Sequence, residues 1–323
     1  MGTKPTALEH PYLFDPSYGY GRAKLLAVGS PDGPPDFAEF WTHTRRMAAA
    51  VPLRLEMREI KSPHEDLRVW EASFDSLGGL RVGAWVTEPR QSDPGAGGWV
   101  VGHGYGGRVE PAFDGLFRTA PAIFFCVRGF NLSASEEIPD SFEHHVLHGI
   151  ESRDTYVHRG CVADIWAAAS ALGEMFPGSA ENLRYFGGSL SGGLGALALP
   201  WDGRFNRAFL DVPSFGNHPL RLRLPGTGSG EYVRLHSVGH PEVISVLAYF
   251  DAATAARSIR IPVFVAAALF DPAVPPPGQF AVYNALPGDK ELFTWTSGHF
   301  STPAEAAEQA QLAARLADWF RCP

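Results

Sequence analysis

A serine in a glycine-rich turn is the residue of this chain best placed to do chemistry. The stretch 183–194 reads as a short apolar strand, the turn Gly187-Gly188-Ser189, and then a helix of small residues. A strand, turn and helix in this order lift a serine hydroxyl above a sheet, where it can attack an ester or amide carbonyl. Glycine on either side allows the tight turn and the close packing of the helix. We therefore predict that Ser189 is a nucleophile.

The match to the usual Gly-x-Ser-x-Gly pattern is incomplete, because Ser191 occupies the place of the second glycine. Taking Ser191 as the nucleophile would align Gly193, but it would lose the first glycine and move the serine two residues away from the strand. Ser189 is therefore the favoured position. A glycine- and serine-rich loop without chemistry is the alternative that the motif alone leaves open.

Partners for the serine follow it in the order that such hydrolases use, first an acid and then a histidine. Asp271 comes directly after a long apolar run, and His299 follows a second predicted strand. Open α/β sheets place their sites at these carboxyl ends of strands. We expect His299 to accept the proton of Ser189 and Asp271 to orient the imidazole. Asp211, after the preceding strand, is the rival acid and is interpreted as support for the neighbouring loop.

An oxyanion hole needs two backbone N–H donors, one from the residue after the nucleophile and one from a loop after an early strand. Leu190 meets the first condition. Tyr105 meets the second, because it lies in the loop 102–108 that follows the short strand near 98–102. We also predict that Phe130 and Phe215, in loops near the site, contact the substrate.

The residues of the whole chain resemble a known family, the acetyl xylan esterase and cephalosporin-C deacetylase group, which is family 7 of the carbohydrate esterases. The resemblance runs over most of the chain and rests on many short matches in order: 36–41, 73–76, 104–108, 128–129, 149–150, 153–156, 187–189, 211–213, 249–251, and 275–276 leading to 283–284.

The resemblance implies an α/β-hydrolase fold, a Ser-Asp-His triad and removal of acetyl groups from sugars. Ser189, Asp271 and His299 match the nucleophile, acid and base of the family, and Tyr105 matches its oxyanion-hole tyrosine. Leu190 stands where the family usually has glutamine, which matters little for a backbone donor. Ser191 stands where the family has glycine, and its Cβ could crowd the oxyanion hole. The resemblance also implies a homo-oligomer, a hexamer with active sites that face an internal cavity.

Composition narrows the class of partner. The chain has 323 residues, of which 45% are hydrophobic and 19% charged, and its net charge is −8. This length supports one large core, and the charge argues against nucleic acid or an anionic membrane surface as a partner.

An odd number of cysteines (Cys126, Cys161 and Cys322) suits a reducing compartment. Residues 1–5 show no apolar signal region and no run approaches the ~20 apolar residues of a membrane span, so we expect a cytoplasmic protein.

We expect neither a metal nor a cofactor. His144, His145 and His148 lie together in an insert at 130–153, but no carboxylate or cysteine is spaced from them as a metal ligand would be. A solvated or substrate-lining loop is the expected role of this insert.

Strand and helix patterns alternate from about residue 98 onward, which is typical of a mostly parallel sheet flanked by helices. We predict a single α/β-hydrolase domain over 1–323, with an amino-terminal extension and helix over 1–50 and an insert at 213–241 that acts as a cap or an oligomer contact. Strands are predicted near 68–76, 81–88, 98–102 and 122–128. Helices are predicted at 36–49, at 155–176 and from Thr302, read as an N-cap.

These observations together predict a serine carboxylesterase that removes acetyl or other short acyl groups from sugars such as acetylated xylo-oligosaccharides. Cephalosporin-type acetyl esters are a side activity that the resemblance implies. Two alternatives stay open. One is another hydrolase of the same fold, such as a peptidase or a lactone hydrolase, since fold and triad do not set the substrate. The other is a non-catalytic protein that keeps the fold.

Overall fold

A computed structural model describes residues 8–91, 97–113 and 115–321. The first residues of the chain, on which the expected lack of a signal region rests, and Cys322 lie outside these ranges. In the described residues one sheet runs through nine strands in the order β1-β2-β3-β5-β4-β6-β7-β8-β9. The strands are β1 (Glu56–Ile60), β2 (Leu67–Asp75), β3 (Arg81–Pro89), β4 (Gly98–Val101), β5 (Ala122–Phe125), β6 (Leu183–Gly188), β7 (Phe205–Asp211), β8 (Val263–Ala268) and β9 (Lys290–Trp295).

The sheet is antiparallel at one edge and parallel elsewhere. The pairs β1–β2, β2–β3 and β3–β5 are antiparallel, and every pair from β5–β4 to β8–β9 is parallel. The predicted mostly parallel sheet flanked by helices is therefore confirmed. The helices are α1 (Arg22–Leu25), α2 (Phe37–Ala49), α3 (Phe142–His145), α4 (Val157–Met175), α5 (Leu190–Ala198), α6 (His218–Arg221), α7 (Ser229–Gly239), α8 (Val243–Leu247), α9 (Ala252–Ala256), α10 (Pro276–Ala285) and α11 (Glu305–Arg321).

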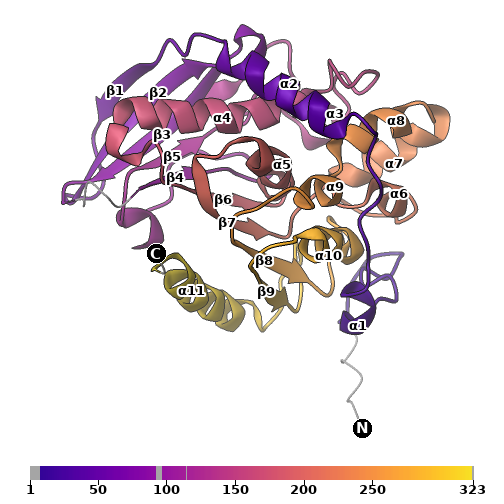
Figure 1. The fold of residues 1–323 in the computed structure, drawn as a ribbon. Helices are drawn as coiled ribbons and strands as arrows, with labels where there is room; N and C mark the ends of the chain where they lie inside the picture. Colours follow the sequence, from indigo (N-terminus) through magenta and orange to yellow (C-terminus); the bar gives the residue numbers. More distant parts are fainter. Residues whose placement is uncertain (1–7, 92–96, 114, 322–323) are drawn as a thin grey trace.

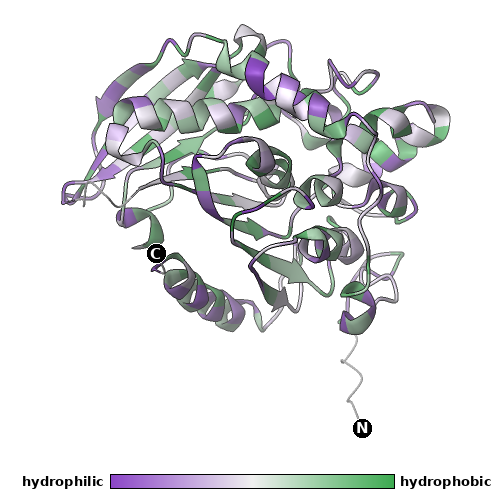
Figure 2. Cartoon of the chain, viewed as in Figure 1, coloured by the Kyte–Doolittle hydropathy of each residue, from purple (hydrophilic) through white to green (hydrophobic). Residues whose placement is uncertain are grey.

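Two hydrophobic cores lie on the two faces of the sheet. Helices α2, α4, α5, α9 and α10 cover one face, and α11 lies on the other (Figure 1). The run β8 is buried on both faces, so neighbouring residues enter different cores, Val265 the first and Phe264 the second. Figure 2 shows the apolar strands inside and hydrophilic residues on the outward side of α11. Because the strands from β5–β4 to β8–β9 run parallel, their carboxyl ends lie together at one end of the sheet.

Several predicted elements agree with the structure to within two residues, among them β2, β3, α2 and α4. The last helix also begins within two residues of its expected first residue, because Thr302 as an N-cap places that residue at 303 and α11 begins at Glu305. The Thr302 carbonyl accepts a turn hydrogen bond from the Glu305 N–H. The insert predicted at 213–241 contains the helices α6 and α7. Its role as a cap or an oligomer contact stays a prediction.

Candidate active site

Ser189 lies at the sharp turn between β6 and α5. Its backbone has φ 52° and ψ −110°, a region that residues other than glycine rarely occupy and that stores strain. The Ser189 N–H donates to the Asp211 carbonyl on the neighbouring strand at 2.8 Å, and the Ser189 carbonyl accepts from Gly193 at 3.1 Å. Gly187 has no room for a side chain, because a Cβ there would meet the backbone of Ser191. The strand, turn and helix thus hold the serine in the predicted conformation.

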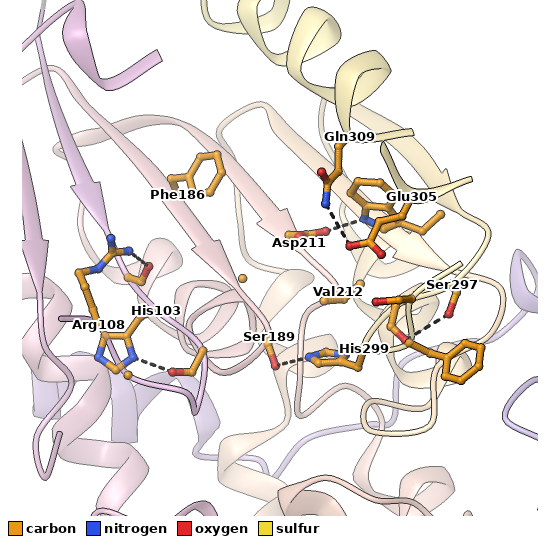
Figure 3. A pocket seen from close by; sticks show the side chains of 18 of the residues that line it. His103, Arg108, Phe186, Ser189, Asp211, Val212, Ser297, His299, Glu305 and Gln309 are labelled. Carbon is orange, nitrogen blue, oxygen red and sulfur yellow. Dashed lines mark hydrogen bonds between the residues drawn. The ribbon is translucent and has the colours of Figure 1, made fainter. Parts of the chain in front are cut away.

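The structure brings Ser189, His299 and Asp271 into one hydrogen-bonded chain. Ser189 Oγ lies 3.1 Å from His299 Nε2, and His299 Nδ1 lies 2.9 Å from Asp271 Oδ2. Figure 3 shows the serine hydroxyl directed at the imidazole. Because a carboxylate only accepts, the Nδ1 atom carries the proton and Nε2 is left to accept the serine proton. This is the arrangement that a nucleophilic serine requires.

Asp271 is fully buried and all of its hydrogen-bonding capacity is used. Oδ1 accepts from the N–H groups of Ala273 and Val274, both at 2.9 Å. Oδ2, besides His299, accepts from Gln279 Nε2 at 2.9 Å. Gln279 is itself buried, and its Oε1 accepts from the Ala268 N–H. Sequence reasoning missed Gln279, since a glutamine within an apolar helix carries no motif.

Two opposing effects set the pKa of His299: burial of its ring and the charges of nearby carboxylates. Burial acts to lower the pKa of its imidazole, but the Asp271 charge and hydrogen bond, with a contribution from the Asp211 charge, raise that pKa above its ordinary value. Its side chain remains 30% exposed, so the ring can meet a substrate. Asp211, the rival acid, makes no hydrogen bond to His299 in the described part of the chain; its Oδ1 accepts from Trp295 Nε1 at 2.8 Å.

Ser191 fits its buried position without crowding the turn. Its hydroxyl donates to the His103 carbonyl at 2.6 Å, and it occupies the space that a Cβ on Gly102 would need. The serine that replaces the expected glycine therefore ties α5 to the loop after β4. This loop contains Tyr105, the predicted oxyanion donor.

The buried ring of His103 also stabilises this loop through two hydrogen bonds. Its Nε2 accepts from the Val127 N–H at 2.9 Å, so Nδ1 carries the proton and donates to the Gly104 carbonyl at 2.7 Å. Burial lowers the pKa of His103 to about 4, which keeps the ring neutral. Across the turn, Leu190 opens α5, and the first N–H groups of a helix have no intrahelical partner. That the Tyr105 and Leu190 N–H groups hold an oxyanion stays a prediction.

Two buried histidines contact the Tyr105 hydroxyl, and sequence reasoning assigned neither of them this role. The hydroxyl lies 3.2 Å from His158 Nε2 and 3.4 Å from His145 Nδ1. His145 Nε2 lies 3.1 Å from the Arg128 carbonyl, so that nitrogen donates and Nδ1 accepts from the tyrosine. Both imidazoles have a lowered pKa because of burial. They therefore anchor the loop that carries Tyr105 as neutral groups.

We predict that Tyr105→Phe lowers both stability and kcat. The change leaves two buried imidazole nitrogens without a partner, which costs about 1–3 kcal/mol, and it frees the loop that carries the donor. Urea unfolding and ester hydrolysis measure the two effects. Tyr249→Phe removes the hydroxyl that bonds Asp36, away from the site, and serves as the control. Equal kinetic effects in both variants would contradict the anchoring role.

The insert at 130–153 departs from the expected solvated loop at His145, which is fully buried. His144 instead contacts the Ser141 hydroxyl at 2.9 Å. Nowhere in residues 8–91, 97–113 and 115–321 do three His, Cys, Asp or Glu side chains gather as a metal site would require. Within the same residues no helix is long and apolar enough to cross a membrane.

Phe130 and Phe215 lie beneath the site rather than in it. Phe130 is 4% exposed and packs on His103, Tyr105 and His145, whereas Phe215 is 1% exposed and packs on His158. Neither side chain lines the two cavities that meet at Ser189. Their direct contact with substrate stays a prediction, and the structure gives both a packing role.

The amino-terminal extension packs against the loops that carry the acid and the histidine. The Asp271 N–H donates to the Pro16 carbonyl at 3.1 Å. His10 packs on Phe270, and Tyr12 packs on Phe300, the residue after His299. Residues far away in sequence thus help to hold Asp271 and His299 in place.

Two cavities meet at Ser189 and His299. The smaller, about 380 Å³, is lined by the loop segment 104–106, Phe142, Ala273, Val274 and the segment 227–229. The larger, about 750 Å³, lies between the loop after β4, the ends of β6 and β7, and the start of α11 (Figure 3). An ester bound at Ser189 therefore has separate space for each of its two halves.

Buried titratable groups near the site make stability depend on pH. Burial lowers the pKa of His103 and His145 to about 4 and of His218 to about 3, and it lowers that of His158 as well. In the unfolded chain these imidazoles return to their ordinary pKa of 6.5. Burial raises the pKa of two other groups, Asp211 and Asp251, to about 6, so they bind protons in the folded state and act in the opposite sense.

We therefore expect the protein to lose stability as the pH falls from 6.5 to about 4.5. Near pH 5 unfolding takes up about two protons net, which corresponds to about 3 kcal/mol per pH unit. Urea midpoints across this window measure the slope, and His218→Gln should reduce it by about one proton. A midpoint that does not change with pH in this window would contradict the prediction.

Comparison with known proteins agrees with this geometry. A family model described as acetyl xylan esterase (AXE1) matches residues 28–313. The acetyl esterase Axe7A of Xylanibacter ruminicola is 25% identical over 171 residues, 52% of this chain and 39% of that protein. The match thus spans less than half the length of this relative.

Solved structures share the fold. An acetyl xylan esterase from Paenibacillus sp. R4 superposes with a TM-score of 0.80 at 22% identity, covering 91% of this chain and 98% of that one. Acetyl xylan esterase 1 from Thermoanaerobacterium sp. JW/SL YS485 gives 0.75 at 20% identity, with 92% and 98% covered. An acylaminoacyl peptidase from Pyrococcus horikoshii gives 0.62 at 12% identity, with 84% and 42% covered. These likenesses confirm the predicted α/β-hydrolase fold.

Proposed function

The chain belongs to the acetyl xylan esterase family, and on that premise we propose that it is a serine esterase that removes acetyl groups from acetylated sugars such as xylo-oligosaccharides. The observation that carries the proposal is the hydrogen-bonded chain from Ser189 through His299 to Asp271. Burial and full hydrogen bonding of Asp271 keep that chain in one geometry. No cofactor enters the proposed reaction.

The proposed reaction has two stages. Ser189 Oγ attacks the acetyl carbonyl carbon as His299 Nε2 takes its proton, and the oxyanion is held by the N–H groups of Tyr105 and Leu190. The C–O bond to the sugar then breaks, and His299 returns the proton to the departing alcohol oxygen. Water, deprotonated by His299, next attacks the acetyl carbon. The bond to Ser189 Oγ then breaks, His299 returns the proton to that oxygen, and acetate is released.

The raised pKa of His299 predicts a pH profile. Neutral His299 is the base, so kcat/KM for p-nitrophenyl acetate should fall on the acid side with a midpoint above 6.5. Asp211→Asn should move this midpoint to lower pH, because the Asp211 charge contributes to raising it. A midpoint at or below 6.5 in the parent enzyme would contradict the assignment of His299.

Acyl specificity follows from the smaller cavity, whose lining by Phe142, Ala273 and Val274 suits a short apolar acyl group. Hydrolysis of p-nitrophenyl esters from acetate to octanoate tests this, with acetate expected to be the best substrate. By resemblance we also propose cephalosporin-type acetyl esters as a side activity. A preference for octanoate would retain the nucleophile but refute the acetyl assignment.

The same fold occurs in peptidases, and an assay of a peptide amide beside an acetyl ester separates the two classes. We expect turnover of the ester alone. If neither is hydrolysed and Ser189 resists a fluorophosphonate probe, the non-catalytic alternative is correct.

Assembly is proposed from the resemblance, and location from the odd number of cysteines. We propose a homo-oligomer, a hexamer, and a cytoplasmic protein. Light scattering on the purified protein tests the first: six chains per particle are expected, and a monomer would refute it. Fractionation of cells that express the native gene tests the second: the protein is expected in the cytoplasmic fraction, and recovery outside the cell would refute it.

A further inference from the structure

The larger cavity has a chemical character that the reaction at Ser189 does not itself require. Three carboxylate residues line it, Glu110, Asp211 and Glu305, against one cationic residue, Arg108. Arg108 is engaged with the Gly102 carbonyl at 3.0 Å and with the ring of Phe124. The cavity is therefore acidic beside the catalytic pair, and it is about twice as large as the smaller cavity.

Asp211 is the carboxylate of this cavity that belongs to the sheet. It ends β7, next to the Ser189 turn, and its Oδ1 is held by the Trp295 indole at 2.8 Å. In the described part of the chain Trp295 is the only side chain that donates to this carboxylate. A fixed acceptor that lines a cavity beside the nucleophile suits a hydroxyl of a bound alcohol.

Glu305 and Gln309 form the wall that α11 contributes. Gln309 Nε2 donates to Glu305 Oε1 at 3.2 Å, so the carboxylate and amide are held together. Figure 3 shows these two side chains grouped with Asp211, across the cavity from His103 and Arg108. Paired acceptors and donors of this kind match the closely spaced hydroxyls of a sugar ring.

We propose that the larger cavity binds the alcohol half of the ester, that it accepts hydroxyl-rich leaving groups that are neutral or cationic, and that its carboxylates disfavour anionic ones. The inference rests on the proposed function, since it needs ester cleavage at Ser189. It assigns the acyl group to the smaller, more apolar cavity. It also ranks substrates within the family activity: neutral sugar acetates above uronate acetates or cephalosporin-type acetates, which carry a carboxylate.

The size of the effect follows from Coulomb's law. The two carboxylates considered are Asp211 and Glu305. We expect them to lower kcat/KM about tenfold or more for an anionic leaving group that lies within about 8 Å of both, at the dielectric constant of a half-open cavity. Burial raises the pKa of Asp211 to about 6, so that at pH 8 this group is a carboxylate.

The test compares three monoacetylated sugars at pH 8: a methyl xyloside, a methyl glucuronide and a methyl glucosaminide. Their acetate release is measured for the parent enzyme, Asp211→Asn, Glu305→Gln and the double variant. Asparagine at 211 keeps an oxygen for the Trp295 indole, so the wall retains its shape. Glu181→Gln, an exposed carboxylate before the other end of β6, is the matched control.

We expect the parent enzyme and Glu181→Gln to prefer the neutral xyloside over the glucuronide about tenfold, and the double variant to reduce this ratio severalfold. A ratio near one in the parent, or an unchanged ratio in the double variant, would overturn the inference. If p-nitrophenyl acetate is still hydrolysed in either case, the proposed subsite is refuted but the proposed function stands. If the parent enzyme hydrolyses no ester at all, the proposed function is overturned as well.

Discussion

Ser189→Ala should lower kcat for p-nitrophenyl acetate by about 10⁴- to 10⁶-fold, because it removes the only atom that forms the acyl-enzyme bond in the proposed reaction. The fold should survive the change, since alanine retains the two backbone hydrogen bonds that hold the turn. In these the residue 189 N–H donates to the Asp211 carbonyl and its carbonyl accepts from the Gly193 N–H. The residual rate would come from the oxyanion donors and substrate positioning. Steady-state kinetics with a circular dichroism check of the fold measure the effect.

Ser191→Ala is the informative comparison. It removes the hydrogen bond to the His103 carbonyl, which should cost about 1 kcal/mol of stability and reduce activity only modestly. The two serines are two residues apart and differ in which one contacts His299. A large kinetic loss in Ser191→Ala with a small loss in Ser189→Ala would reverse the assignment of the nucleophile.

Asp271→Asn should lower kcat by about 10⁴-fold. The asparagine amide would donate to His299 Nδ1, which places the imidazole proton on Nε2, where it can no longer accept the proton of Ser189. The backbone donors at Ala273 and Val274 can still bond the remaining oxygen, so the loop should keep its shape. The acid-side midpoint should also move to lower pH, because the Asp271 charge and hydrogen bond raise the pKa of His299.

Asp211→Asn makes the same chemical change on the neighbouring strand. We expect a loss with p-nitrophenyl acetate of at most about tenfold, because Asp211 acts on His299 only through its charge and makes no hydrogen bond to it in the described residues. If Asp211→Asn lost as much activity as Asp271→Asn, the acid of the reaction would have to be reassigned.

The pairing of Ser189, His299 and Asp271 could be predicted because each follows a strand with a clear apolar pattern. The sheet geometry then brings carboxyl ends of strands together without further information. The strand β1 was not predicted, because it is an exposed edge strand whose residues show no apolar alternation.

Contacts between distant segments were beyond sequence patterns. His145 and His158 contact Tyr105 from 40 and 53 residues away, and no local motif links them. Phe130 and Phe215 lie in loops near the site, yet both side chains turn into the core. Which way a loop side chain faces depends on packing against partners that the sequence does not identify.

A fluorophosphonate probe followed by peptide mass analysis tests the central claim most directly. The proposed reaction predicts one modified residue, Ser189, with ester hydrolysis lost in proportion to labelling and with no labelling in Ser189→Ala. His299→Ala should slow the labelling strongly, because Ser189 would lack its base. Labelling at Ser191, or full ester hydrolysis by the unlabelled Ser189→Ala variant, would contradict the assignment of Ser189 as the nucleophile.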